Sequence, residues 1–319
     1  MLTLPNYKIF TDDLTTHKIE YQVCFMRVFF MSDLKTFGIV GGDKRQLYLA
    51  QSLLQDGYNV ILAGFDALRD QGLSSFSSVD AALLYSDAVI LPLPSVRADK
   101  TLNAPHAPQP ILFSELQQRL LCEKPVFAAM RDRLLRAYPA LEEAPLFDYA
   151  ARDDFAILNA VPTAEGAVEL AMREYEGTIF GSRSMVVGFG RIGKLLANML
   201  KNLGSDVTVC ARKPSDFAYI EALGYRAKNT AALSVVHGYD LVFNTVPALI
   251  FDEKLLRNTD KATLLTDLAS LPGGVDFESA LALGVNAHRA LALPGKCAPK
   301  SAGEIIKKTV FSIIEEVNR

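Results

Sequence analysis

The chain has 319 residues, enough for about two domains, and half of the residues are hydrophobic, so it can bury substantial cores. Its 33 Lys and Arg residues nearly balance its 36 Asp and Glu residues, and the net charge of −3 argues against a nucleic-acid partner and against binding to an anionic membrane surface. The scattered Cys and His residues form no disulfide framework and no metal motif of known spacing, which indicates a reducing cytoplasm, and no apolar run is long enough to span a bilayer.

Residues 1–35 precede the first clear strand pattern. Their one apolar stretch, Val23–Met31, is short, is interrupted by Arg27 and is followed by no small-residue cleavage site, which makes a signal peptide a poor interpretation. We expect these residues to be an N-terminal extension outside the fold. The alternative is an additional strand or helix that docks on the first domain.

Residues 36–162 are predicted to form an α/β domain of the flavodoxin-like type. Short apolar runs alternate along this segment with stretches of helical spacing, and such alternation is typical of a parallel, doubly wound sheet. The predicted strands are Phe37–Val40, Tyr58–Ala63, Ala88–Leu93, Val126–Ala129 and Phe155–Asn159. Pro162 is expected to end the last strand, and Thr163 to cap the following helix.

That helix and its linker, residues 163–180, are predicted to bridge the first domain to a second doubly wound parallel-sheet domain of the Rossmann type, residues 181–296. The strands predicted in the second domain are Ser184–Val187, Val207–Cys210, Leu241–Thr245, Ala262–Leu268 and Val285–Leu291. The last helix, residues 297–319, is expected to return to the first domain, with Ser301 and Glu304 as its capping box.

The strongest functional motif is a GxGxxG pattern that follows a predicted strand and opens a predicted helix. Its first glycine permits a tight turn, its second lets the backbone approach a diphosphate, and its third lets the helix pack on the strand. The free N–H groups at the helix start then bind the phosphates. The sequence therefore predicts a nicotinamide-dinucleotide site that contains Gly188, Phe189, Gly190, Arg191, Ile192 and Gly193.

The end of the second strand of this domain indicates which dinucleotide is bound. NAD sites place an acidic residue there for the ribose hydroxyls, but this chain has Ala211, Arg212 and Lys213. Both cations suit a 2′-phosphate, and Arg matches its oxygens with a planar pair of donors. We predict NADP as the cofactor, with the alternative that Arg212 and Lys213 are only solvated surface cations.

Two further turns are expected to flank the nicotinamide end of the cofactor, because parallel sheets bind ligands at the carboxyl ends of their strands. The residues expected in these turns are Thr245, Val246, Pro247, Asp267, Ala269 and Ser270. Asp267 is either a catalytic group beside the nicotinamide or a carboxylate that shapes its own turn.

The domain order and the glycine motif resemble those of the 2-hydroxyacid dehydrogenases, but this chain lacks the catalytic residues of those enzymes. They have an Arg after the fifth strand and a His near the last helix. This chain has the stretch Ser270–Gly274 at the first place and Lys300 at the second.

A larger set of residues is similar to the family of dipicolinate synthase A subunits of endospore-forming bacteria, over roughly Phe37 to the C-terminus. The matching blocks are Ile39–Asp43 with Arg45-Gln46, Gly64–Asp66, Arg152–Asp154, Val161–Thr163 with Glu165-Gly166, the glycine motif, Asn244-Thr245 with Pro247, Asp267–Ser270, Pro272–Gly274, Leu293–Gly295, Ala298–Lys300 and Ala302-Gly303. One departure is Leu271, where members of this family often have an Arg.

This resemblance implies NADP-linked oxidation of dihydrodipicolinate, or of its hydroxylated precursor, to dipicolinate during sporulation, in the cytoplasm of the mother cell. It also implies a partner, a B subunit similar to flavoprotein decarboxylases. A possible homo-oligomer stays open. The alternative functions are a 2-hydroxyacid-dehydrogenase-like enzyme with altered acid and base residues and a non-catalytic, NADP-binding regulatory subunit.

A site for a ring dicarboxylate needs two anion-binding groups and a proton acceptor beside the nicotinamide. The candidates for catalysis are Lys300, Glu165 and Asp267, and those for substrate binding are Thr163, Arg152, Ser270, Ser301 and Ser95. Lys300 precedes a helix whose dipole adds to its charge. The alternatives are an exposed Lys300, a Thr163 and Glu165 that only begin a helix, and an Arg152 that pairs with Asp153 or Asp154.

Overall fold

The computed structural model of the protein describes residues 31–68 and 76–319, so most of the predicted N-terminal extension lies outside the described residues. Residues Met31–Asp33 form a short 3-10 helix, and Met31 is only 3% exposed within the core of the first domain. The prediction that the extension lies outside the fold is therefore wrong from Met31 onward.

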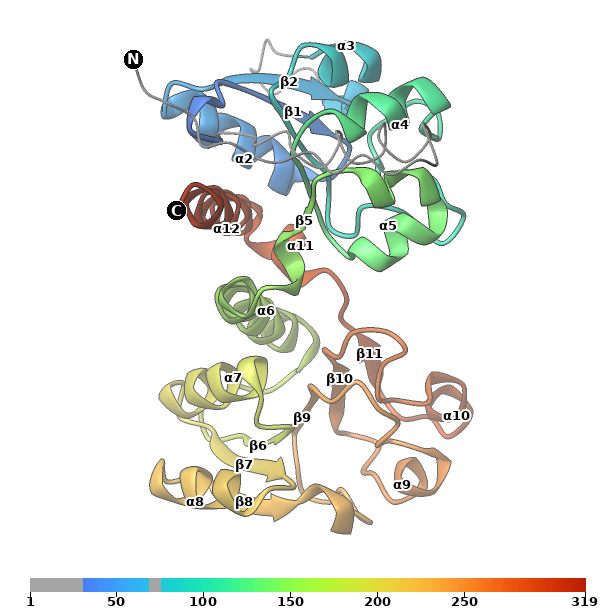
Figure 1. The fold of residues 1–319 in the computed structure, drawn as a ribbon. Helices are drawn as coiled ribbons and strands as arrows, with labels where there is room; N and C mark the ends of the chain where they lie inside the picture. Colours follow the sequence, from blue (N-terminus) through green and yellow to red (C-terminus); the bar gives the residue numbers. More distant parts are fainter. Residues whose placement is uncertain (1–30, 69–75) are drawn as a thin grey trace, which may run out of the picture.

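The first domain contains a parallel five-stranded sheet within the described residues (Figure 1). Its strands are β1 (Thr36–Val40), β2 (Asn59–Ala63), β3 (Ala88–Ile90), β4 (Val126–Ala128) and β5 (Leu146–Asp148). Their spatial order is β2-β1-β3-β4-β5, the flavodoxin-like order, which confirms the predicted fold class. The helices between the strands are α2 (Lys44–Gln55), α3 (Val79–Leu84), α4 (Glu115–Cys122) and α5 (Arg131–Ala137).

The bridging helix α6 (Asp153–Glu174) begins earlier than predicted and contains the segment that was predicted as a strand. Pro162 lies inside this helix, and Thr163 is not its cap, because the Thr163 hydroxyl donates to the Asn159 carbonyl one turn back, at 2.7 Å. The apolar run Phe155–Asn159 has too few residues to distinguish a strand from a buried helical turn. The fifth strand of the sheet is instead β5, whose three residues Leu146–Asp148 are too few to form a recognisable strand pattern in the sequence.

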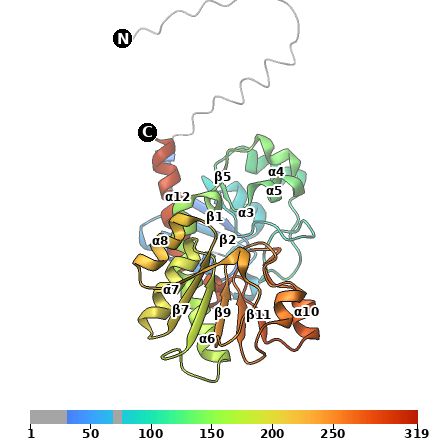
Figure 2. The same ribbon diagram turned by 90° about the horizontal axis from the view of Figure 1, so that it is seen from below.

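The second domain contains a parallel six-stranded sheet of the Rossmann type, in the order β11-β10-β9-β6-β7-β8. Its strands are β6 (Arg183–Val187), β7 (Asp206–Ala211), β8 (Arg226–Asn229), β9 (Leu241–Asn244), β10 (Leu264–Asp267) and β11 (Ala287–Arg289). Strand β8 carries no apolar run and escaped the sequence prediction. Figure 2 shows β7 and β11 on either side of β9. The helices are α7 (Arg191–Asn202), α8 (Pro214–Ala222), α9 (Glu253–Arg257) and α10 (Phe277–Ala282).

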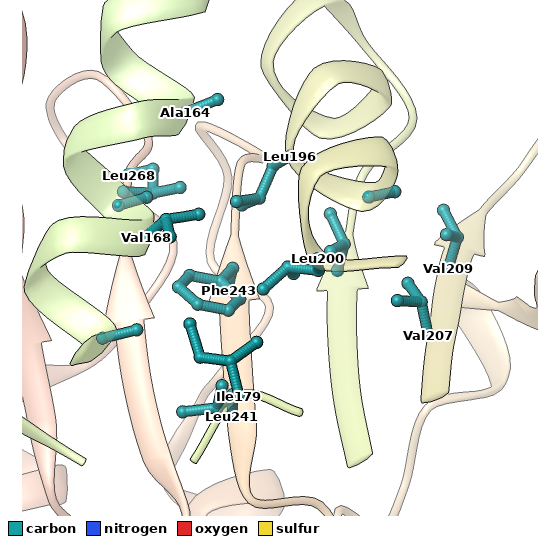
Figure 3. Packing of buried hydrophobic residues seen from close by; sticks show 14 of the residues in the cluster. Ala164, Val168, Ile179, Leu196, Leu200, Val207, Val209, Leu241, Phe243 and Leu268 are labelled. Carbon is teal, nitrogen blue, oxygen red and sulfur yellow. The ribbon is translucent and has the colours of Figure 1, made fainter. Parts of the chain in front are cut away.

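Helix α6 packs on both domains: Phe155 in its first turn joins the core of the first domain, and its second half packs on the second domain. Its buried residues Ala164 and Val168 share one hydrophobic cluster with Leu196 and Leu200 of α7. In Figure 3 the ring of Phe243 of β9 lies between the side chains of Val168 and Leu200. Helices α6 and α7 therefore cover the same face of the second sheet, and α7 starts directly after the glycine turn.

The chain returns to the first domain through α11 (Leu293–Cys297) and α12 (Pro299–Val317). Residues Ile306, Val310 and Ile313 of α12 join the core of the first domain. In Figure 1 the last helix lies between α2 and α6. Because α12 begins at Pro299 with Ala298 before it, Ser301 stands inside the first turn and the predicted capping box is wrong.

No helix among the described residues is long and apolar enough to cross a membrane.

The packing of α12 on α2 makes a specific prediction about stability. A Cβ on Gly303 would lie 2.5 Å from the Arg45 carbonyl oxygen and 2.9 Å from the Leu49 nitrogen, both backbone atoms that cannot easily move. Gly303→Ala should therefore lower the free energy of unfolding by about 1–3 kcal/mol in chemical denaturation. Ser301→Ala, an exposed control on the same helix, should cost less than about 0.5 kcal/mol because no cap is lost. A larger loss in Ser301→Ala than in Gly303→Ala would contradict this description of the helix start.

Candidate functional site

A cavity of about 600 Å³ opens at the carboxyl ends of β6, β7 and β9. It contains most of the residues predicted from the glycine motif, the cation pair and the turn after β9. Its lining residues are Gly188, Phe189, Gly190, Lys194, Ala211, Arg212, Lys213, Asp216, Thr230, Thr245, Val246, Pro247, Ala248 and Ile250. Arg191, Ile192, Gly193 and Ala269, which were also predicted to bind the cofactor, do not line it. Lys194 and Asp216 were not predicted, because Lys194 directly follows the last glycine of the motif and Asp216 lies three residues after Lys213, so each stands just outside the pattern.

The glycine turn is closed by contacts that leave no room for side chains. Gly188 has φ +103°, and a Cβ on it would collide with the Thr245 hydroxyl. A Cβ on Gly193 would collide with the Gly188 carbonyl oxygen, so α7 lies directly against the turn. Gly190 precedes α7 and has open space around it, and no side chain caps the helix. The start of α7 therefore presents free N–H groups to the cavity, which is the arrangement that binds a diphosphate.

The predicted cation pair lies at the end of the cavity next to β7, opposite the turn after β9. Arg212 and Lys213 are exposed and directly follow β7, and in the part of the chain that the structure describes neither side chain makes an ion pair. Thr230 closes this end by donating its hydroxyl to the Ala211 carbonyl, at 3.2 Å. Asp216, in the first turn of α8, adds one carboxylate to the same wall. This end can bind an anionic group, with Asp216 moderating its positive charge.

Asp267 forms a buried network that fixes the turns after β9 and β10. It is 1% exposed, and its carboxylate accepts hydrogen bonds from Asn244 Nδ2 at 2.8 Å, from the Ala269 nitrogen at 3.2 Å and from the Gly274 nitrogen at 2.9 Å. Asn244 also bonds to the backbone of Val246, at 3.0 and 3.2 Å. These contacts are those of a carboxylate that shapes its own turn, the second of the two roles expected for Asp267.

Thr163 and Glu165 lie away from the glycine turn. Helices α6 and α7 begin side by side, where Asp153 pairs with Arg191. They run in the same direction, since Ala164 and Val168 of α6 follow each other in the same order as Leu196 and Leu200 of α7 in Figure 3. Glu165 is exposed and lies beside Met199 and Asn202, near the end of α7. A helix rises 1.5 Å per residue, so this end is about 15 Å from the glycine turn. Neither Thr163 nor Glu165 lines the cavity.

Arg152 and Ser95 are occupied by contacts within the fold. Arg152 donates to Asp154 at 2.9 Å and to Glu316 of α12 at 2.7 Å, and these hydrogen bonds raise its pKa and lower the pKa values of both carboxyls. Ser95 is 1% exposed, and its hydroxyl donates to the Pro92 carbonyl and accepts from the Ala129 nitrogen, at 3.1 and 2.9 Å. Both side chains therefore tie parts of the fold together.

Lys300, Ser301 and Ser270 remain exposed, and within the described residues their side chains take part in no assigned hydrogen bond. Lys300 and Ser301 lie in the first turn of α12, close to the junction with α11. At that junction a Cβ on Gly295 would lie 2.9 Å from an Asp43 carboxylate oxygen of the first domain. Lys300 and Ser301 thus stand where the two domains meet.

The first domain contributes a charged group to this junction that the sequence did not single out. Arg45 is 5% exposed and binds Asp43 at 2.9 Å and the Leu93 carbonyl at 2.9 Å. Burial alone would raise the pKa of Asp43, but the hydrogen bonds and charge of Arg45 outweigh it and lower the pKa. Burial lowers the pKa of His106 nearby, which favours the neutral imidazole. The sequence signal was the family-matching block with Asp43, Arg45 and Gln46, whereas His106 comes from a separate Pro-rich loop.

Comparison with known proteins assigns this architecture to one family. The family model described as the N-terminal domain of the dipicolinate synthase A subunit matches residues 36–150, and the model for ketopantoate reductase PanE/ApbA matches residues 184–266. The A subunit of dipicolinate synthase from Bacillus subtilis (strain 168) is 32% identical over 287 residues, which cover 88% of this chain and 95% of that protein.

Two crystal structures extend this similarity to the whole fold. The A subunit of dipicolinate synthase from Bacillus halodurans matches with a TM-score of 0.78 and 29% identity, covering 88% of this chain and 97% of that chain. The corresponding crystal structure from Bacillus subtilis matches with a TM-score of 0.74 and 30% identity, covering 88% and 96%. The chain belongs to the family of dipicolinate synthase A subunits.

Proposed function

We propose that this protein is an NADP-dependent oxidoreductase that converts dihydrodipicolinate, or its hydroxylated precursor, to dipicolinate as the A subunit of a dipicolinate synthase. The observation that carries the proposal is the cavity at the glycine turn, with Arg212 and Lys213 at its far end, in a chain of this family. The relatives are named for dipicolinate synthesis, and a planar ring dicarboxylate is accordingly the proposed substrate.

The residues at the cavity fit an extended dinucleotide. The uncapped start of α7 at Gly190 would hold the diphosphate, and Arg212 with Lys213 would hold the 2′-phosphate. The turn Thr245–Ala248, held by the Asn244–Asp267 network, would flank the ribose next to the nicotinamide. When bound, the nicotinamide ring accepts the hydride that the substrate loses.

The reaction from dihydrodipicolinate removes one hydride and one proton from the ring, and the hydroxylated precursor must lose water as well. Because the product ring is aromatic, the oxidation is strongly favourable, and the protein mainly has to position the ring and bind its two carboxylates. Lys300 is the proposed anion-binding group, since its charge adds to the positive start of α12. Ser301 and Ser270 are the proposed neutral donors.

The remaining proposed contributions concern assembly and place of action. A B subunit similar to flavoprotein decarboxylases is the proposed partner, because the relatives are named as A subunits of a synthase. We also propose that the chain forms a homo-oligomer and that it acts in the cytoplasm of the mother cell.

A non-catalytic, NADP-binding subunit is the second candidate. It is favoured by the contacts that occupy Arg152, Ser95 and Asp267 within the fold. The two functions are separated by measuring NADPH formation from dihydrodipicolinate with this chain alone, with this chain and a B-type subunit together, and with only the B-type subunit. Catalysis predicts NADPH formation only in the samples that contain this chain. If NADPH forms in none of the three samples, the second function is favoured.

The cation pair predicts a selective loss of NADP affinity. Arg212→Ala removes a charge-assisted contact worth about 1.5–3 kcal/mol, so the dissociation constant for NADP should rise about 10- to 100-fold, while that for NAD stays unchanged. Arg226→Ala, which removes an exposed arginine of the neighbouring strand β8, is the matched control. Isothermal titration calorimetry measures the constants for NAD and NADP in both variants and in the unaltered protein. An equal loss of affinity for NAD and NADP would rule out the 2′-phosphate contact.

Lys300 predicts an effect on substrate rather than on cofactor. Lys300→Ala should raise KM for dihydrodipicolinate about tenfold or more, because a charged hydrogen bond to a carboxylate is lost, and should leave cofactor affinity unchanged. Lys308→Ala on the exposed side of the same helix should behave like the unaltered protein. If both variants show the same KM as the unaltered protein, Lys300 does not bind the substrate.

A further inference from the structure

The glycine motif contains one arginine that does not reach the cavity. Arg191 is the first residue of α7, directly after Gly190, so it stands beside the helix start that is proposed to hold the diphosphate. Gly190 and Lys194, on either side of it in sequence, line the cavity, whereas Arg191 does not. Its side chain is 55% exposed. The one basic residue of the motif thus pairs with a carboxylate and does not line the place where an anion would bind.

The partner of Arg191 is a carboxylate from another helix. Arg191 Nε donates to Asp153 Oδ1 at 2.7 Å, and Nη2 bonds to the same oxygen. Asp153 is the first residue of α6, at the point where the chain leaves the first domain. Its neighbour Asp154 pairs instead with Arg152, which also binds Glu316 of α12. Two consecutive carboxylates therefore hold two different arginines.

We infer that Asp153 competes with the diphosphate of the cofactor for Arg191 and thereby sets the affinity of the cofactor site. The inference rests on the proposed cofactor function. A long arginine side chain at the first position of α7 can turn from Asp153 to a phosphate above the helix start, and a diphosphate offers more charge and more acceptor oxygens than one carboxylate.

The exposure of the pair decides the size of the effect. Both side chains are more than half exposed, and such ion pairs contribute little, so the diphosphate displaces Asp153 when it binds. Breaking the pair beforehand, by neutralising Asp153, should tighten cofactor binding about two- to fivefold. Bound cofactor in turn releases the start of α6 from α7, which couples occupancy of the second domain to the segment that joins it to the first.

The chain offers a matched control for this inference in Asp154. Asp153→Asn and Asp154→Asn each remove one negative charge at adjacent positions of the same helix turn, but only Asp153 contacts Arg191. Titration of the full chain with NADPH should show about two- to fivefold tighter binding to Asp153→Asn and unchanged binding to Asp154→Asn. In an Arg191→Ala background, Asp153→Asn should have no further effect.

Ligands that differ in their phosphates separate this inference from the proposed choice of NADP. NADH carries the same diphosphate without the 2′-phosphate, so Asp153→Asn should tighten NADH binding by the same factor even if the chain proves not to prefer NADPH. Adenosine 2′-monophosphate lacks the diphosphate, and its binding should not change. Equal tightening in both Asn variants, tightening that persists without Arg191, or tightening of adenosine 2′-monophosphate would overturn the inference.

Discussion

The functional end of the second domain depends on how closely α7 lies against the strand that precedes it. The Gly188 carbonyl occupies the space that a Cβ on Gly193 would need, and the Thr245 hydroxyl occupies the corresponding space at Gly188. This contact keeps the start of α7 uncapped at the carboxyl edge of the sheet, where its N–H groups are available to an anion. The same contact places Arg191, the first residue of α7, beside the cavity.

Connections between the domains place the remaining groups. The chain leaves the first domain through α6, which packs on the second, and returns through α12, which packs on the first. Arg152 joins the start of α6 to the end of α12, and the α11–α12 junction lies against Asp43 of the first domain. Lys300 consequently stands at the domain junction, although it comes from the C-terminal segment. The buried Asn244–Asp267 pair holds the turns after β9 and β10.

Sequence patterns predicted those features that depend on local geometry. The glycine motif, the cations after β7 and the alternation of strands and helices each reflect a constraint within a few residues, and the structure contains them. Helix boundaries were harder, because Pro162 stands where a helix start is favoured and yet is accommodated within α6. Ser301 with Glu304 fits a capping box, but Pro299 begins the helix two residues earlier. The partners of Arg152 and Ser95 come from distant segments, so spacing alone could not show that these side chains were already occupied.

A crystal structure of the chain with NADP and dipicolinate tests the central claim most directly. The account predicts the diphosphate above the start of α7, the 2′-phosphate against Arg212 and Lys213, and a ring carboxylate within hydrogen-bond distance of Lys300 at the domain junction. A cofactor whose 2′-phosphate points into solvent away from Arg212 and Lys213, or a dipicolinate bound away from the nicotinamide, would contradict it.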